Sequence, residues 1–229
     1  MSASERPAPF PYDFAAVGVA VRVVVSGAVL HMRPSGALWL ERDRTLVVAD
    51  LHLEKGSAYA SRGQLLPPYD TRETLRRLAE EVAQLDPLTI VMLGDAFHDG
   101  GAEDRLSLDD ARAVHRLAHR RTLVWVVGNH DPSPPESLPG DSVDELELAG
   151  LALRHEPVAG PSPREAAGHL HPCARIVAGG RSVRRRCFVT DGERLVLPAF
   201  GGLFARPPLA VALGSRRAHA VGWWSVAGD

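Results

Sequence analysis

The stretch Val127-Gly128-Asn129-His130-Asp131 follows an apolar run that begins at Leu123. Such a run of β-branched and aromatic residues is typical of a short buried strand. The glycine then predicts a turn that presents an amide, an imidazole and a carboxylate together. Taken alone, this pattern is also compatible with an ordinary turn at the end of a strand, since Asn and Asp favour such positions.

Two other strand-like runs end in the same kind of residue. Residues 45–49 lead into Asp50-Leu51-His52, and residues 88–93 lead into Gly94-Asp95. Because side chains alternate along a strand, we expect those of Asp50 and His52 to point the same way and to be able to bind one ion. Three apolar strands followed by metal-ligand residues predict a site at one edge of a sheet.

The segments between these strands carry helix signals. Asp70 and Glu73 have the spacing of a capping box and predict a helix that ends before Pro87. A second helix is predicted from Ser107 to about Arg120. The resulting order, strand–helix–strand–helix–strand, is typical of crossover units and of a mostly parallel sheet.

The second half of the chain has hairpin signals instead. Short strands are predicted on both sides of Gly150, and Asp191-Gly192 is a strong hairpin turn. Further strands are predicted at 19–30, 36–40, 174–178, 186–190, 194–197, 209–213 and 218–226. We therefore expect two sheets packed as a sandwich with helices outside, in one domain over residues 19–229 after a loose tail at 1–18.

Composition indicates an ordinary globular protein. The formal net charge of −2 over 229 residues argues against a surface that is basic throughout. Lys55 is the only lysine, a bias that we attribute to codon composition. Two cysteines are too few for a disulfide framework, so we expect reduced thiols. The start of the chain lacks the pattern of a secretory signal, and the apolar run at 14–30 is interrupted and too short to span a membrane. We expect a cytoplasmic protein with no membrane contact.

Seven potential metal ligands follow predicted strands or lie in the loops between them. They are Asp50, His52, Asp95, Asn129, His155, His169 and His171. Carboxylate, imidazole and amide groups together suit manganese, iron or zinc better than calcium. Seven ligands are too many for one tetrahedral ion and fit two ions that share a bridging carboxylate. Asp95 follows the central one of the three strands and is the natural bridge.

Five blocks of these residues carry a resemblance to a known family. They are Asp50-Leu51-His52, Gly94-Asp95, Gly128-Asn129-His130-Asp131, His155 and Gly168-His169-Leu170-His171. In this order, over about residues 45–172, they resemble the signature of the calcineurin-like metallophosphoesterase superfamily. The resemblance implies an α/β/β/α fold of four layers, in which two mixed β-sheets form a sandwich flanked by helices. It also implies a first metal site at Asp50, His52, Asp95 and His171, and a second at Asp95, Asn129, His155 and His169.

Several other stretches are similar to one branch of that superfamily, the ligase-associated DNA-damage-response endonucleases of bacteria (PdeM-type). They are residues 49–56, 66–71, 94–100, 155–157, 168–172, 187–188 and 197–201. This similarity implies a nuclease in DNA repair, with two divalent ions, most suitably Mn²⁺, and with DNA or another phosphodiester as substrate. A repair ligase or helicase is implied as partner by the resemblance alone. His98 stands where many phosphatases of the superfamily carry Asp, which argues against a phosphoprotein phosphatase.

The expected chemistry is hydrolysis by a hydroxide that two metal ions activate and hold in line with phosphorus. His130 is the expected catalytic residue, because it would lie beside the metals and protonate the leaving oxygen. Asp131 could orient the His130 ring. Arg184, Arg185 and Arg186 form a dense basic cluster that we interpret either as a solvated hairpin or as a nucleic-acid contact.

Two other functions compete with the nuclease. The first is a small-molecule hydrolase of cyclic nucleotides or nucleotide pyrophosphates that uses the same metals. The second is a binding scaffold that has lost catalysis. The presence of all seven ligands argues against the scaffold.

Overall fold

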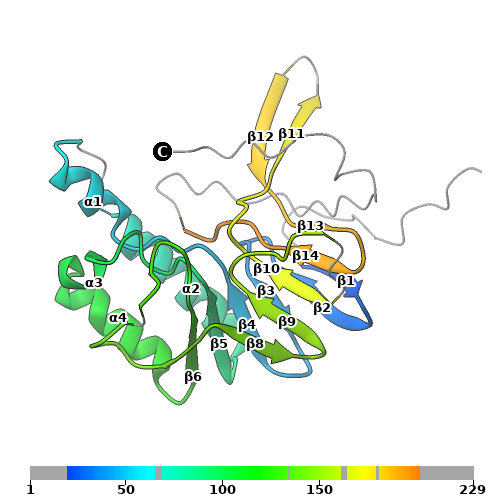
Figure 1. Cartoon of the computed structure of the whole chain (residues 1–229), viewed down its shortest axis with the longest axis horizontal. Coiled ribbons are helices and arrows are strands. Elements are labelled where there is room, and N and C mark those ends of the chain that lie inside the picture. The colour runs from blue at the N-terminus through cyan, green and yellow to red at the C-terminus, as the bar shows by residue number, and fades with distance from the viewer. Residues whose placement is uncertain (1–19, 65–68, 134, 161–163, 179–180, 202–229) are drawn as a thin grey trace, which may run out of the picture.

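The structure, a computed structural model, describes residues 20–64, 69–133, 135–160, 164–178 and 181–201 (Figure 1). The predicted tail at 1–18 and the predicted strands at 209–213 and 218–226 lie outside the described residues.

A sheet of seven strands forms the centre of the described fold. Its order is β1 (Val21–Val25), β2 (Ala28–Met32), β3 (Leu38–Leu40), β4 (Thr45–Val48), β5 (Thr89–Leu93), β6 (Thr122–Val126) and β7 (Asp141–Val143). The strands from β4 to β7 pair in parallel, and those from β1 to β4 pair antiparallel. The predicted parallel crossover layer is confirmed. Since parallel strands end at the same edge, the ligand residues after β4, β5 and β6 lie at one edge.

Helices cover one face of this sheet. They are α1 (Lys55–Ser61), α2 (Asp70–Leu85), α3 (Ala102–Arg105) and α4 (Leu108–Ala118). Leu78 of α2 and Val114 of α4 are fully buried in one apolar cluster with Ile90 and Trp125 of the sheet. The apolar residues of α2 and α4 recur at helical spacing, and the faces that they form pack on the strands.

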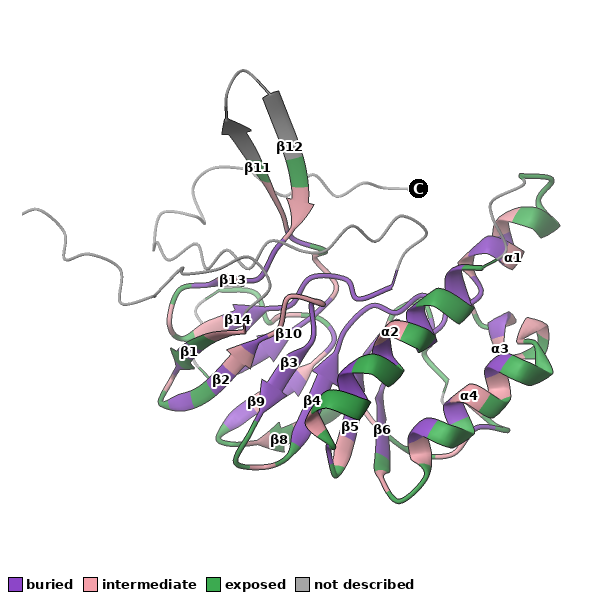
Figure 2. Cartoon of the chain, turned by 180° about the vertical axis from the view of Figure 1, so that it is seen from behind, coloured by how far each residue is buried: buried purple, intermediate pink, exposed green. Residues whose placement is uncertain are grey.

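A second sheet packs on the opposite face. Its order is β13 (Val189–Thr190), β14 (Arg194–Val196), β10 (Glu165–Ala167), β9 (Leu151–Arg154) and β8 (Glu145–Leu148). Val47 and Val91 of the first sheet share a buried apolar cluster with Leu153 and Leu195 of the second. Of the strands that contribute to the two sheets, β4 and β10 are coloured as buried along their length in Figure 2.

The predicted two-sheet α/β sandwich is confirmed. Within the described residues it consists of a helical layer and two sheets, and the helices shown in Figure 1 lie on the side of the seven-stranded sheet. A second helical layer, which the four-layer fold expects, is not among the described residues. A separate hairpin of β11 (Cys173–Ala178) and β12 (Arg181–Arg186) projects from the sandwich (Figure 1).

Several predicted elements needed correction. The single strand expected at 19–30 is a hairpin, because Ser26 and Gly27 both adopt positive φ and reverse the chain. The prediction of one strand at 186–190 is wrong, since β12 ends at Arg186 and the separate short strand β13 begins at Val189. The short helices α1 and α3 were not predicted, because seven and four residues are too few for a visible apolar period.

The two predicted helix starts had different outcomes. Ser107 caps α4 as predicted, and its hydroxyl oxygen accepts from the Asp110 amide at 3.1 Å. The prediction of a capping box that begins at Asp70 is wrong, since Tyr69 is the N-cap residue and its side chain forms no capping hydrogen bond. Oδ2 of Asp70 accepts instead from the Gly56 amide of α1 at 2.9 Å.

Both cysteines are free, as expected. No helix in the described part of the chain has the length and apolar character that a membrane span requires.

Candidate metal centre

Two ligand-bearing segments run side by side beyond the ends of β4 and β5. The amide of Asp50 donates to the Gly94 carbonyl at 3.2 Å, and the amide of His52 donates to the Asp95 carbonyl at 2.9 Å. Asp50 and His52 have φ values of 53° and 45°, so neither continues the pleat of β4. Their side chains converge as expected. The alternation of side chains along a strand is not the cause, because these two residues are not in strand conformation. A left-handed backbone held by the neighbouring segment brings them together.

Glycine is required at two points where these loops meet. A side chain at Gly94 would place its Cβ 2.2 Å from Nδ1 of His155, and Gly94 has a φ of 73°. A Cβ at Gly128 would lie 2.2 Å from Oδ1 of Asp95. Both glycines therefore allow the loops to approach closely enough for their ligands to share one centre.

The residues predicted for the first metal site lie together. Nε2 of His171 lies 3.3 Å from Nε2 of His52 and 3.2 Å from Oδ1 of Asp50. Oδ2 of Asp95 lies 3.9 Å from the same His52 nitrogen. Burial, followed by the charge of His171, lowers the pKa of His52 to about 3. His52 is therefore neutral, which is the form that binds a metal ion.

The residues predicted for the second metal site surround one nitrogen of His155. Its Nε2 lies 2.9 Å from Oδ1 of Asn129, 3.3 Å from Oδ1 of Asp95 and 3.2 Å from Nδ1 of His169. Two ligand atoms that each lie about 2.0–2.2 Å from a common ion are separated from one another by distances like those just given for His155. Burial opposes a charge on His155, but the carboxylates of Asp95 and Asp50 outweigh it and raise its pKa.

Asp95 faces both groups at once. Its Oδ1 is directed to His155 and accepts from the His130 amide at 2.9 Å, while its Oδ2 is the oxygen nearest His52. Burial opposes its ionisation, but hydrogen bonds from His155 and from the His130 amide lower its pKa to about 2. Asp95 therefore lies between the two clusters of candidate ligands.

The charge of this centre fits bound cations. Asp50 and Asp95 are 0% and 2% exposed, and neither forms an ion pair with Lys or Arg within the described residues. Two buried carboxylates need opposite charge nearby, because burial of an uncompensated anion is costly. The carboxylate and imidazole groups clustered here could hold divalent ions of the manganese, iron or zinc type.

Groups outside the ligand set orient two of the imidazoles. Nε2 of His169 lies 3.3 Å from Oε1 of Glu156, so Nδ1 is left to face the centre. Nδ1 of His155 lies 3.3 Å from the Leu93 carbonyl, which leaves its Nε2 for the ligand cluster. Such partners fix the tautomer of a ligand histidine. The role of Glu156 was not predicted, although the His-Glu-Pro stretch placed it next to His155.

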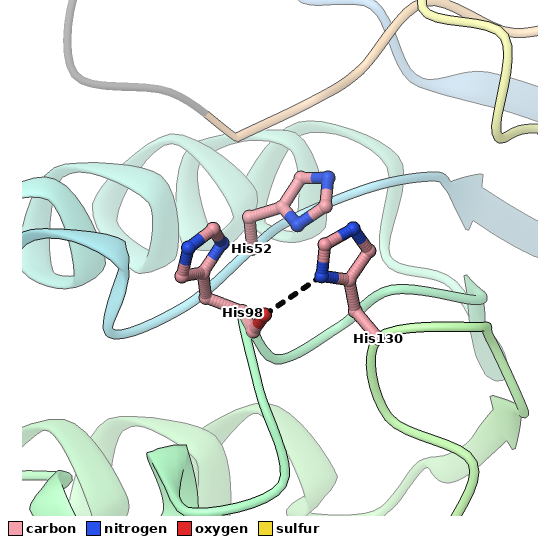
Figure 3. Close-up of side chains that lie close together, drawn as sticks. All are labelled: His52, His98 and His130. Atoms are coloured by element: carbon pink, nitrogen blue, oxygen red, sulfur yellow. Dashed lines mark hydrogen bonds between the residues drawn. The ribbon is translucent and has the colours of Figure 1, made fainter. Parts of the chain in front are cut away.

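The His130 ring lies beside that of His52, with the two centroids 5.1 Å apart (Figure 3). The His130 side chain is 42% exposed, and its Nε2 lies 4.0 Å from Oδ2 of Asp95. Nδ1 lies 2.9 Å from the carbonyl oxygen of His98, to which it donates. The expectation that Asp131 orients the ring is therefore wrong. Oδ2 of Asp131 accepts from the Phe97 amide at 3.0 Å instead.

The three arginines of the predicted contact differ from one another. Arg184 is exposed and Arg185 half-buried on β12. Arg186 points inward, where its guanidinium donates to the carbonyls of residues 199–201. Burial, and then the charge of Arg77, lowers the pKa of Arg186 to about 10. The guanidinium of Arg186 is therefore engaged within the fold, which argues against its predicted contact with nucleic acid.

The chain is similar to known phosphoesterases. The calcineurin-like phosphoesterase family matches residues 43–181. The crystal structure of Pseudomonas putida nuclease MPE superposes with a TM-score of 0.67 at 32% identity, covering 86% of this chain and 94% of the nuclease. Yfce, a phosphoesterase from E. coli, gives a TM-score of 0.39 at 17% identity over 69% of this chain and 80% of that one. A comparison with curated proteins gave no match.

The family match agrees with the site. The matched region contains all seven predicted ligands and His130. It also contains α2, α4 and the strands β4 to β6 that position them. The chain belongs to the calcineurin-like phosphoesterase family, whose members are metal-dependent phosphoesterases.

Proposed function

We propose that this phosphoesterase is a nuclease that cleaves phosphodiester bonds within nucleic acid, with two divalent metal ions, in bacterial DNA repair. The observation that carries the proposal is the position of Asp95 between the two clusters of candidate ligands. Asp50, His52 and His171 would hold the first ion, Asn129, His155 and His169 the second, and Asp95 both. The similarity to a nuclease over 86% of the chain supports nucleic acid as the substrate.

The bound ions supply an activated water and neutralise charge on the phosphate. The residues of the chain hold the ligands in place and supply a proton. The left-handed segment at Asp50–His52 and the segment after β5 hold the ligands at fixed separations, so the site needs little reorganisation. His130 donates its Nδ1 proton to the His98 carbonyl, which leaves Nε2 to carry the proton that the leaving oxygen receives.

Manganese is the metal proposed for this centre, because carboxylate and amide oxygens stand beside the imidazoles. The test begins with protein stripped by a chelator and reloaded with Mn²⁺, Fe²⁺ or Zn²⁺. Each form is assayed on a generic phosphodiester, a phosphomonoester, cyclic nucleotides, nucleotide pyrophosphates, and circular and linear DNA.

Conversion of circular DNA to linear form, with Mn²⁺ most active and Asp95→Asn inactive, is the expected result. Efficient cleavage of a nucleotide with no cleavage of any DNA would support the small-molecule hydrolase. Full activity after chelation would contradict the metal-dependent site.

A further inference from the structure

Helix α1 presents three side chains toward the neighbourhood of the metal centre. Lys55, Tyr59 and the capping residue Arg62 are four and three positions apart, so they lie on one face of the helix. Lys55 and Tyr59 are half-buried, and Arg62 is exposed. This set of two cations and one ring is called the α1 face below.

The rings connect the α1 face to the catalytic residue. Tyr59 stacks on His98 with centroids 5.9 Å apart, and His98 stacks on His130 with centroids 5.6 Å apart. His98 also meets the edge of His52 at 5.7 Å. Figure 3 shows the His98 ring beside those of His52 and His130. A continuous path of rings therefore runs from α1 to His130.

The cations of the α1 face are available to an anion. The ammonium group of Lys55 and the guanidinium group of Arg62 form no hydrogen bond or ion pair with any residue that the structure describes. Their charges still reach the site, because both add to burial in lowering the pKa of His98. Positive charge without a partner beside a phosphoesterase centre favours a second phosphate.

The identity of residue 55 is itself informative. Among 26 basic residues, this is the one lysine, in a chain that otherwise uses arginine. A lysine presents a compact point charge on a flexible stem, which suits contact with a single phosphate group.

The inner side of α1 is fixed in place. The amide of Gly56 donates to Asp70 at 2.9 Å, and Nε of Arg105 donates to the hydroxyl of Ser57 at 3.0 Å. These bonds tie α1 to α2 and α3. The α1 face therefore keeps its position relative to the metal centre, which a binding site requires.

We propose that Lys55, Tyr59 and Arg62 form a subsite for the nucleotide adjacent to the scissile phosphodiester. Lys55 and Arg62 bind the neighbouring backbone phosphate, and Tyr59, supported by His98, stacks on the base. This inference rests on the proposed function, because it assumes a polynucleotide substrate. It predicts that binding strength depends on α1 whereas the chemistry of a minimal diester does not.

The single lysine permits a direct test without metal or turnover. Metal-free wild-type protein is acetylated with an amine-reactive ester, with and without a DNA oligonucleotide, and Lys55 is compared with the N-terminal amine by mass spectrometry. We expect the oligonucleotide to slow acetylation of Lys55 several-fold, with the protection lost at high salt. Equal acetylation of Lys55 with and without the oligonucleotide at low salt would overturn the subsite.

Variants test the same inference in the metal-loaded enzyme. Lys55→Gln and Arg62→Gln should each raise KM for an oligonucleotide about tenfold and reduce the salt slope by about one. Tyr59→Leu should weaken oligonucleotide binding by a similar factor, and Tyr59→Phe should restore it. In all these variants the turnover of bis(p-nitrophenyl) phosphate should stay within about twofold of the wild-type value. Arg112→Gln, which removes an exposed charge from α4, is the control and should stay within the same range for both substrates.

The outcomes separate the two proposals. An equal loss on the oligonucleotide and on the minimal diester would contradict the subsite, since α1 would then act on the centre itself. A wild-type enzyme that cleaves no nucleic acid but shows protection of Lys55 would contradict the proposed nuclease and leave the α1 face as a surface that binds nucleic acid.

Discussion

Oδ1 of Asp95 lies 3.3 Å from Nε2 of His155, on the inner side of the metal centre. The other oxygen of the same carboxylate is turned toward His52, 3.9 Å away. One side chain thus contacts both halves of the ligand set, and its fixed orientation explains how seven residues from separate segments can form one centre.

Asp95→Asn should remove most activity, because the amide cannot supply the charge that two cations share. A loss of several kcal/mol in the stabilisation of the transition state corresponds to a rate reduction of about 100-fold or more. Metal content by mass spectrometry should fall with the rate. Asp99→Asn is the matched control, since Asp99 binds Arg105 at 2.8 Å and not the ligands. An Asp95→Asn protein with full metal content and full rate would contradict the bridge.

His130→Ala should retain its metal ions and lose about 100-fold or more of its turnover on DNA. The loss should be much smaller on a p-nitrophenyl diester, because that leaving group departs without a proton. Steady-state rates on the two substrates measure the difference. His115→Ala, at an exposed position of α4, should match the wild type. An equal loss on both substrates would contradict the role as proton donor.

Asp131→Ala should lower stability, because the buried amide of Phe97 loses its acceptor. The expected cost is about 1–3 kcal/mol, or roughly 2–4 °C in Tm for each kcal/mol at this chain length. Thermal unfolding measures the change. Asp131→Asn keeps a carbonyl oxygen at this position and should recover part of the stability. An unchanged Tm in the alanine variant would show that water replaces the carboxylate.

Arg186 and Arg185 should give opposite phenotypes although they are neighbours in the sequence. Arg186→Gln should lower Tm, because the carbonyls of residues 199–201 lose a buried donor. The affinity of the Arg186→Gln variant for DNA should depend on salt concentration in the same way as that of the wild type. Arg185→Gln should keep its Tm and flatten the salt dependence, provided that the β11–β12 hairpin contacts nucleic acid. Loss of stability in Arg185→Gln with none in Arg186→Gln would reverse these assignments.

Much of the fold followed from the sequence for local reasons. The stripes of α2 and α4 and the apolar runs of β4, β5 and β6 are periodic patterns that depend on neighbours a few positions away. The Ser107 cap and the Asp191-Gly192 turn are equally local. The short helices α1 and α3 and the hairpin at Ser26 lack such a pattern and were missed.

The sequence by itself determined which residue types stand at the ends of three parallel strands, and hence the site and its donor chemistry. Only the tertiary structure decided what the other polar side chains do. Asp70 holds α1, Asp131 holds the Phe97 amide, and the His98 carbonyl orients His130. These hydrogen bonds join residues 14 to 34 positions apart. Their partners depend on how separate segments pack, and no local period or motif records that packing.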